Sequence, residues 1–173
     1  MLGYNPCGAQ EEGGCPFCPP PDCAPCPCPP PPAPCACNTA YAQYAAMSNG
    51  PSLSRIPLRL LAEEGGLVQA AGTDTLTLSA GHIYLVGYTF LATPEDGQYF
   101  QIVPEVGGAL KLLYSTAGSA SGTRIASAAG SFLVTETAAA DATLAFRLTY
   151  GEGTRNIDLT GVVYAVPVAA ARQ

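Results

Sequence analysis

The cysteines and prolines of this chain are concentrated at its beginning. All eight cysteines lie within the first 37 of its 173 residues, together with twelve of the seventeen prolines, and residues 38–173 contain no cysteine. A segment so rich in proline lacks the backbone donors for helix or sheet and the apolar side chains for a core. The sequence therefore predicts two parts, an N-terminal arm at residues 1–37 and a body at residues 38–173.

The arm is expected to be extended. Between Cys15 and Cys37 nearly every residue is proline, cysteine or alanine, a composition typical of polyproline II. At about 3.1 Å per residue, this stretch would reach roughly 70 Å. We expect a semi-rigid spacer whose chemistry is that of its thiols.

The thiols have three possible uses. Two CxxC motifs, at residues 15–18 and 23–26, offer four thiolates to zinc or an iron–sulfur cluster, but the three prolines between them resist the necessary chain reversal. Redox catalysis would require a thioredoxin-like unit around a CxxC motif, and no such pattern surrounds these cysteines. Disulfides, many of them between subunits, are the interpretation we favour, because the prolines hinder closure of short loops. The cross-linking candidates are Cys7, Cys15, Cys18, Cys23, Cys26, Cys28, Cys35 and Cys37.

The body has the pattern of an all-β domain. In residues 144–150 apolar side chains alternate with Arg147 and Thr149, and glycine-containing turns recur along the chain. About nine short strands in this length predict an antiparallel sandwich or barrel. The expected strands are residues 41–47, 56–61, 75–78, 83–91, 99–103, 109–114, 131–137, 144–150 and 161–168.

Two of these strands are apolar on both faces. In residues 83–91, one face carries Ile83, Leu85 and Leu91, and the other face is rich in tyrosine; residues 162–166 are also apolar throughout. Because one face of an antiparallel sandwich strand usually meets water, a second apolar face favours a covering partner subunit. Loops of the same chain are the alternative cover. The predicted trimer-interface residues are Tyr84, Val86, Tyr88, Phe90, Val162, Tyr164 and Val166.

Several segments resemble a known family. Residues 80–88, AGHIYLVGY, are similar to a strand of tumour-necrosis-factor-like jelly rolls, the complement-type globular heads. Together with residues 41–44, 118–125 and 160–164, they most closely resemble the C-terminal heads of bacterial collagen-like spore-surface (exosporium) proteins. The resemblance implies a jelly roll of about 8–10 strands that forms a homotrimer and caps a filament on the spore.

The arm departs from that family. No glycine occurs between Gly14 and Gly50, so a collagen triple helix, which needs glycine at every third position, is impossible there. The arm would take the place of the collagen stalk as a spacer or anchor. The resemblance also implies synthesis in the mother cell without export and exposure when that cell lyses, after which disulfides can form.

Charge and hydropathy exclude some partners. The net charge is −6 and no basic cluster is present, so we expect no nucleic-acid partner. No apolar run approaches the roughly 20 residues of a membrane span, and no secretory signal is recognisable at the start. We expect no membrane partner. The expected partners are further copies of the chain, in a homotrimer that can assemble into fibres, and disulfide-linked neighbouring subunits or an anchor protein of a spore layer.

The body is poor in catalytic groups. Its single histidine, His82, is expected to be a strand-end residue, and the acidic pairs at 63–64 and 95–96 are expected to be solvated turn charges. The resemblance offers Asp74, Asp141 and Asp158 for a calcium site at a trimer apex, as in some heads of that superfamily, but the spaced oxygen ligands of a dedicated calcium loop are lacking. We therefore expect no enzyme activity, no catalytic residue, no metal in the body and no cofactor.

The sequence thus predicts a structural, self-assembling surface protein of a bacterial spore or filament, with a trimeric β head and a cross-linking arm. One alternative is an adhesin whose head binds a carbohydrate or receptor, which exposed aromatics such as Tyr99 and Phe100 at one pole would favour. The other alternative is a metal-binding protein acting through the eight thiols.

Overall fold

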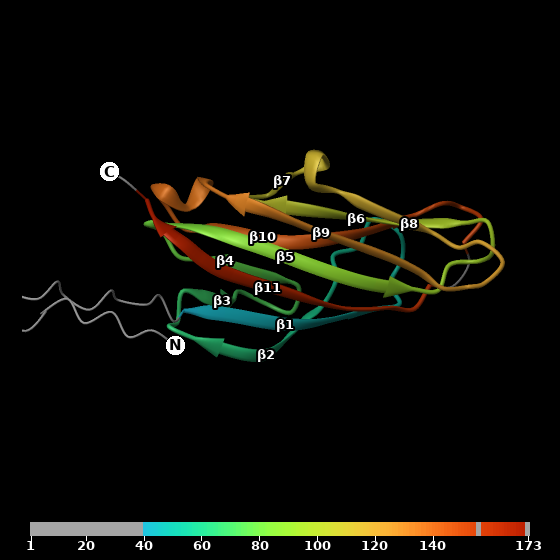
Figure 1. Ribbon diagram of the computed structural model, residues 1–173, viewed down its shortest axis with the longest axis horizontal. Helices are drawn as coiled ribbons and strands as arrows, with labels where there is room; N and C mark the ends of the chain where they lie inside the picture. Colours follow the sequence, from blue (N-terminus) through green and yellow to red (C-terminus); the bar gives the residue numbers. More distant parts are fainter. Residues whose placement is uncertain (1–39, 155–156, 172–173) are drawn as a thin grey trace, which may run out of the picture. The chain divides into compact units, whose positions relative to one another are not determined.

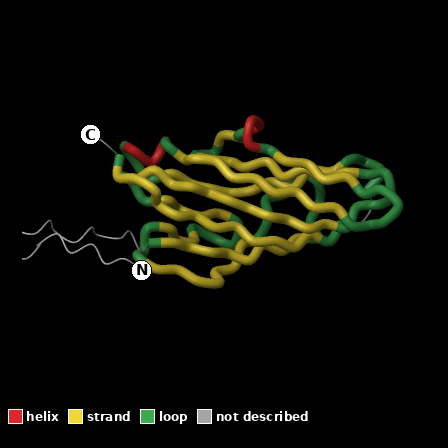
Figure 2. Tube along the Cα trace, in the orientation of Figure 1, coloured by secondary structure: helices red, strands yellow, loops and turns green. Residues whose placement is uncertain are grey.

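The computed structural model describes residues 40–154 and 157–171. Strands dominate this part of the chain, and two short 3-10 turns lie at its margin (Figures 1 and 2). The strands are β1 (Tyr41–Ser48), β2 (Leu58–Glu64), β3 (Val68–Ala70), β4 (Thr75–Leu78), β5 (His82–Ala92), β6 (Tyr99–Val106), β7 (Ala109–Leu110), β8 (Thr116–Ser119), β9 (Ala126–Val134), β10 (Ala142–Tyr150) and β11 (Leu159–Ala170), and the 3-10 turns are η1 (Leu112–Tyr114) and η2 (Glu136–Ala138).

The strands form two antiparallel sheets. One sheet has the order β2-β1-β11-β5-β9; the other has the order β3-β4-β10-β6-β7, with β8 also paired to β6. The two sheets lie one over the other in Figure 1, and every strand pair is antiparallel. The predicted all-β antiparallel sandwich is confirmed. The arm and the predicted boundary at residues 37/38 lie outside the described residues.

The core lies between the sheets and follows the alternation of the sequence. On β10, Leu144, Phe146 and Leu148 are fully buried, whereas Arg147 between them faces outward. Facing them from β5, Tyr88 and Phe90 place their rings 5.3 and 6.0 Å from that of Phe146. Aromatic packing of this kind supplies much of the buried apolar area of a small sandwich.

The placement of Tyr84, Val86, Tyr88 and Phe90 corrects a prediction. These four residues are at most 2% exposed and belong to the core of a single chain, so their assignment to a trimer interface is wrong. Tyrosine is tolerated in this core because each hydroxyl reaches a backbone acceptor: Tyr84 donates to the Ser79 carbonyl at 3.0 Å and Tyr88 to the Tyr114 carbonyl.

Two strand boundaries also differ from the prediction. The strand expected at 109–114 is only two residues long and is followed by η1, and the strand expected at 131–137 begins earlier, at Ala126, and ends before η2. Alanine and serine in residues 126–131 have weak intrinsic strand preference, so pairing with β5 determines this strand. The short strands β3 and β8 were not predicted.

Candidate interaction surface

The outward side of the five-stranded sheet is the most distinctive surface of the body. Register places its residues in rows that cross the strands in the order β1, β11, β5 and β9. We call these residues the outer face: Met47, Thr160, Leu91 and Ser127; Ala45, Val162, Thr89 and Ala129; Gln43, Tyr164, Gly87 and Ser131; and Val166, Leu85 and Leu133.

The outer face carries no charge. Strands β1, β5, β9 and β11 contain no aspartate, glutamate, lysine or arginine. Large apolar side chains on the face are nevertheless in contact with solvent: Met47 is 63%, Leu133 50% and Leu91 47% exposed. An exposed face of an antiparallel sheet is normally polar, whereas the centre of a protein–protein interface is depleted of charge.

Tyr164 lies at the middle of the outer face, over a glycine. Its register partner on β5 is Gly87, and a Cβ placed on Gly87 would collide with the tyrosine ring. The ring therefore packs against bare backbone, an arrangement in which an aromatic side chain covers the gap left by a strand glycine. Tyr164 remains 40% exposed, so it covers the sheet and also presents an aromatic surface.

The structure divides the predicted interface residues between two surfaces. Val162, Tyr164 and Val166 lie on the outer face, partly or largely exposed, whereas the four residues of β5 lie in the core. The β5 residues that share the outer face are Leu85, Gly87, Thr89 and Leu91. The isolated glycine within an apolar strand was the sequence signal for this choice, because it marks close approach to the backbone.

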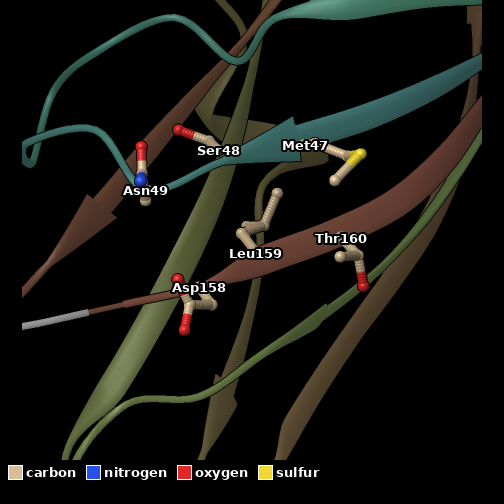
Figure 3. A pocket seen from close by; sticks show the side chains of 6 residues that line it. All are labelled: Met47, Ser48, Asn49, Asp158, Leu159 and Thr160. Atoms are coloured by element: carbon tan, nitrogen blue, oxygen red, sulfur yellow. The ribbon is translucent and has the colours of Figure 1, made fainter.

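Two pockets adjoin the outer face at Met47. The first has a volume of about 380 Å³ and is lined by Met47, Ser48, Asn49, Asp158, Leu159 and Thr160. Figure 3 shows Met47 and Thr160 at one side of it and Asn49 and Asp158 at the other. The second has a volume of about 450 Å³ and is lined by Ala45, Met47, Pro57, Leu58, Arg59, Gly72 and Thr73.

The opposite sheet carries the buried charge of the body. The carboxylate of Glu105 is bonded by Arg55 and by Arg147, whose Nε lies 2.6 Å from Glu105 Oε2. Burial acts to raise the pKa of Glu105, but the hydrogen bonds from the two arginines outweigh it and hold that pKa below its usual value. Arg55 faces Arg147 across an isolated bridge. The Glu105 carboxylate binds both arginines, which offsets their mutual repulsion and fastens the segment before β2 to β10.

The residues considered for catalysis or metal binding lie apart. His82 Nδ1 lies 3.0 Å from the Ala80 carbonyl. Asp141 accepts a hydrogen bond from the backbone of Ala80, before β5, while the backbone of Asp158 is bonded to Thr93, after β5; these two carboxylates therefore belong to opposite ends of that strand. Asp74 accepts a hydrogen bond from Thr75. Residues 40–154 and 157–171 contain no cluster of three or more potential metal ligands.

The acidic pairs stabilise turns. Glu63 accepts a hydrogen bond from the Gly66 backbone at 3.0 Å, and Asp96 accepts one from the Gly122 backbone at 2.7 Å. The eight candidate cross-linking cysteines lie outside the described residues. Within the described part of the chain, no helix has the length and hydropathy of a membrane span.

The pole considered for ligand recognition does not present an aromatic cluster of the expected kind. Tyr99 is 47% exposed, but Phe100 is fully buried in the core. The two side chains point to opposite faces of β6, as successive residues of a strand do. The pair therefore cannot form one aromatic binding surface.

Comparison with known proteins gives the fold. No protein-family model and no curated protein matches the chain. Among solved structures, the globular domain of zebrafish complement 1qA protein is 14% identical, with a TM-score of 0.51, covering 75% of this chain and 98% of that domain. Eiger TNF from S. frugiperda is 13% identical, with a TM-score of 0.49 and coverage of 77% and 94%. Murine APRIL at pH 5.0 is 14% identical, with a TM-score of 0.48 and coverage of 72% and 97%.

Identities this low concern the fold alone, and the match to the complement domain carries the conclusion. The body has the jelly-roll β-sandwich fold of the complement-type globular domain, as the sequence resemblance implied.

Proposed function

We propose that this protein is a non-enzymatic structural protein whose body self-associates as a homotrimer through the outer face. The observation that carries the proposal is the absence of charge from an exposed face of four strands. A solitary body would keep this apolar surface in water, whereas a second copy would cover it.

The energetics favour association through this face. Fully burying a large aliphatic side chain contributes about 1.5–3 kcal/mol. Met47, Leu91 and Leu133 are each about half to two-thirds exposed, so each would contribute about 1 kcal/mol or more when covered. Because the four strands of the outer face contain no charged residue, covering this face desolvates no ion of these strands. Desolvation of ions is otherwise a large cost of burying charged surface.

A trimer is the assembly that the resemblance to spore-surface heads implies, and the jelly-roll fold is consistent with it. The outer face includes Val162, Tyr164 and Val166, the three interface candidates that are not in the core. We infer that they pack near the centre of the assembly, where Tyr164 supplies a large aromatic contact.

The arm would link trimers to one another or to an anchor protein in the outermost layer of a bacterial spore. All eight cysteines lie in residues 1–37, and the body contains none. This distribution supports separate roles, with cross-linking assigned to the arm and trimerisation to the body. Disulfides would form after release from the mother cell, with the arm as a spacer in place of a collagen stalk.

The proposal is tested with two matched variants of the full chain under reducing conditions. Thr89 and Thr143 are both exposed threonines of central strands, but Thr89 lies on the outer face and Thr143 on the outward side of the other sheet. Thr89→Asp places a charge in the proposed interface and should dissociate the trimer in analytical ultracentrifugation. Thr143→Asp should leave the trimer intact.

A wild-type protein that sediments as a monomer when reduced would overturn the proposal. Equal effects of the two substitutions would instead place the interface elsewhere. Ladders of high mass on non-reducing gels that collapse on reduction would support cross-linking through the arm.

A further inference from the structure

A cluster of exposed leucines projects from the body beside β9. We call residues 110–114 the knob. Within it Leu113 is 88%, Leu112 66% and Leu110 51% exposed. Isolated exposed leucines are common on protein surfaces, but three within four residues form a patch of the kind that marks an interaction site.

Contacts with β9 and β5 hold the backbone of the knob in place. The ring of Tyr114 stacks on Phe132 of β9, with the ring centroids 4.8 Å apart. The Tyr114 carbonyl accepts a hydrogen bond from the buried Tyr88 hydroxyl, and the Ser115 hydroxyl donates to the Leu112 carbonyl at 2.7 Å. The leucine side chains are therefore presented on an anchored turn, which lowers the ordering cost of binding.

A pocket of matching apolar character lies at the opposite edge of the five-stranded sheet, beside β2 and β1. The second pocket described above, which we call the edge pocket, is formed by β1, the start of β2 and the loop at residues 72–73, and its lining is mainly apolar. Replacing a buried leucine by alanine leaves a cavity on the order of 150 Å³. At about 450 Å³, the edge pocket has room for the side chain of Leu113 and for that of Leu112 beside it.

The edge pocket carries one arginine, and the flank of the knob carries an ion pair whose carboxylate is partly exposed. Arg59 lines the edge pocket and has no ion pair within residues 40–154 and 157–171. On the knob, Lys111 would repel this arginine, but its Nζ lies 2.6 Å from Glu136 Oε1. The Glu136 side chain is still 46% exposed, so the flank of the knob offers a carboxylate to an approaching cation.

The two sites lie at opposite edges of one sheet. In the order β2-β1-β11-β5-β9, the edge pocket is at the β2 and β1 end and the knob is beside β9. Figure 1 shows η1 and β2 at opposite margins of the body. A contact between two different patches is heterologous; repeated copy after copy, it gives a closed ring such as a trimer when the rotation closes, and an open filament when it does not.

We propose that the knob of one copy seats in the edge pocket of the next copy, with Leu113 entering the pocket and Glu136 facing Arg59. This inference rests on the proposed self-association and adds the contact that orients one copy against the next. The edge pocket shares Ala45 and Met47 with the outer face, so the knob contact continues the interface proposed there.

The test uses the full chain with the photo-reactive residue benzoylphenylalanine at position 113. Isotopically heavy and light copies are mixed, illuminated, reduced and digested, and the cross-linked peptides are identified by mass spectrometry. The expected products join a light copy to a heavy copy at residues 57–59 or 72–73. Position 113 is almost fully exposed, so its replacement leaves the core intact.

Two substitutions accompany the cross-linking. Leu113→Asp should weaken association about tenfold or more, since it places a charge in an apolar pocket. Thr143→Asp is again the control, because Thr143 is exposed on the outward side of the other sheet, away from both sites; association should be unchanged.

The failure of this inference differs from the failure of the proposed function. A trimer that persists with Leu113→Asp, or cross-links between copies that end away from the edge pocket, would overturn the knob contact and leave self-association standing. A reduced wild-type protein that is monomeric and forms no cross-links between copies would overturn both.

Discussion

The ring of Tyr164 on β11 lies over Gly87 on β5, in a position that any side chain at residue 87 would occupy. The pair lies at the centre of the outer face, whose four strands contain no charged residue. Because Tyr164 is at the surface and Gly87 is part of the strand backbone, the contact can be changed without entering the core. Substitutions at this contact therefore test the assembly of the body independently of its folding.

Gly87→Ala should weaken assembly and leave folding nearly unchanged. The added methyl group displaces the Tyr164 ring from the sheet and disturbs the outer face, but no core residue moves. We expect association to fall about tenfold, measured by sedimentation equilibrium of reduced protein, with little change in the thermal midpoint. In a Tyr164→Ala background the same substitution should have no further effect, because the ring that it displaces is gone. A large loss of stability would show that the glycine is needed by the strand itself.

Tyr88→Phe should destabilise the body much more than it weakens its assembly. The substitution removes the donor to the Tyr114 carbonyl, which then lacks this partner beneath the knob. An acceptor left without its partner costs about 1–3 kcal/mol when it is buried. This carbonyl lies in a partly buried place, so we expect about 1 kcal/mol, measured by urea denaturation of the reduced protein. Should the variant keep its stability but lose its association, Tyr88 would belong to an intersubunit surface after all.

Strand β5 shows how much of the outer face could be predicted from the sequence. An apolar strand with two apolar faces indicates that both are covered, but alternation alone does not say which face meets the opposite sheet. The tyrosine-rich face became the core because its hydroxyls reach backbone carbonyls at the margin of the sandwich. The decisive signal was Gly87, because a glycine is expected where a neighbouring side chain approaches the backbone.

Long-range pairings were beyond sequence reasoning. The alternation of Leu144, Phe146 and Leu148 was enough to predict β10, since each of these residues faces the core. By contrast, β3 and β8 are only three and four residues long, and such segments become strands only because a neighbour supplies hydrogen bonds. The knob could not be predicted either, because the apolar residues 109–114 have the composition of a buried strand and are in fact exposed.

Glu105→Gln should lower stability at neutral pH by about 2–3 kcal/mol. The value lies below the roughly 3–5 kcal/mol typical of breaking a buried ion pair, since both arginines remain about a third exposed. Glu105 has a lowered pKa in the folded protein, so its carboxylate stabilises the fold above its unfolded pKa, and this contribution is lost as pH falls through the folded pKa. The difference between wild type and variant in urea denaturation should therefore be large at pH 7 and shrink toward pH 3.

Glu136→Gln provides the matched control for that experiment. Glu136 also has a lowered pKa through a hydrogen bond from Lys111, but its side chain is 46% exposed. An exposed pair of this kind contributes less than about 1 kcal/mol. Equal losses for the two variants would mean that burial does not distinguish the Glu105 cluster from a surface ion pair.

Leu53→Asn should raise the stability of the body. Leu53 has a φ of 72°, in the left-handed region that costs a residue with a branched side chain roughly 1–2 kcal/mol and that asparagine tolerates better. Two contacts hold the backbone there: the Leu53 amide donates to the Leu148 carbonyl at 2.8 Å, and Arg147 donates to the Leu53 carbonyl at 3.0 Å. The leucine side chain is 66% exposed and contributes little packing in return. We therefore expect asparagine to add about 1 kcal/mol in urea denaturation and glycine to add less, because glycine loses more backbone entropy on folding. If asparagine lowered stability only in the assembled protein, the leucine side chain would be in contact with another copy.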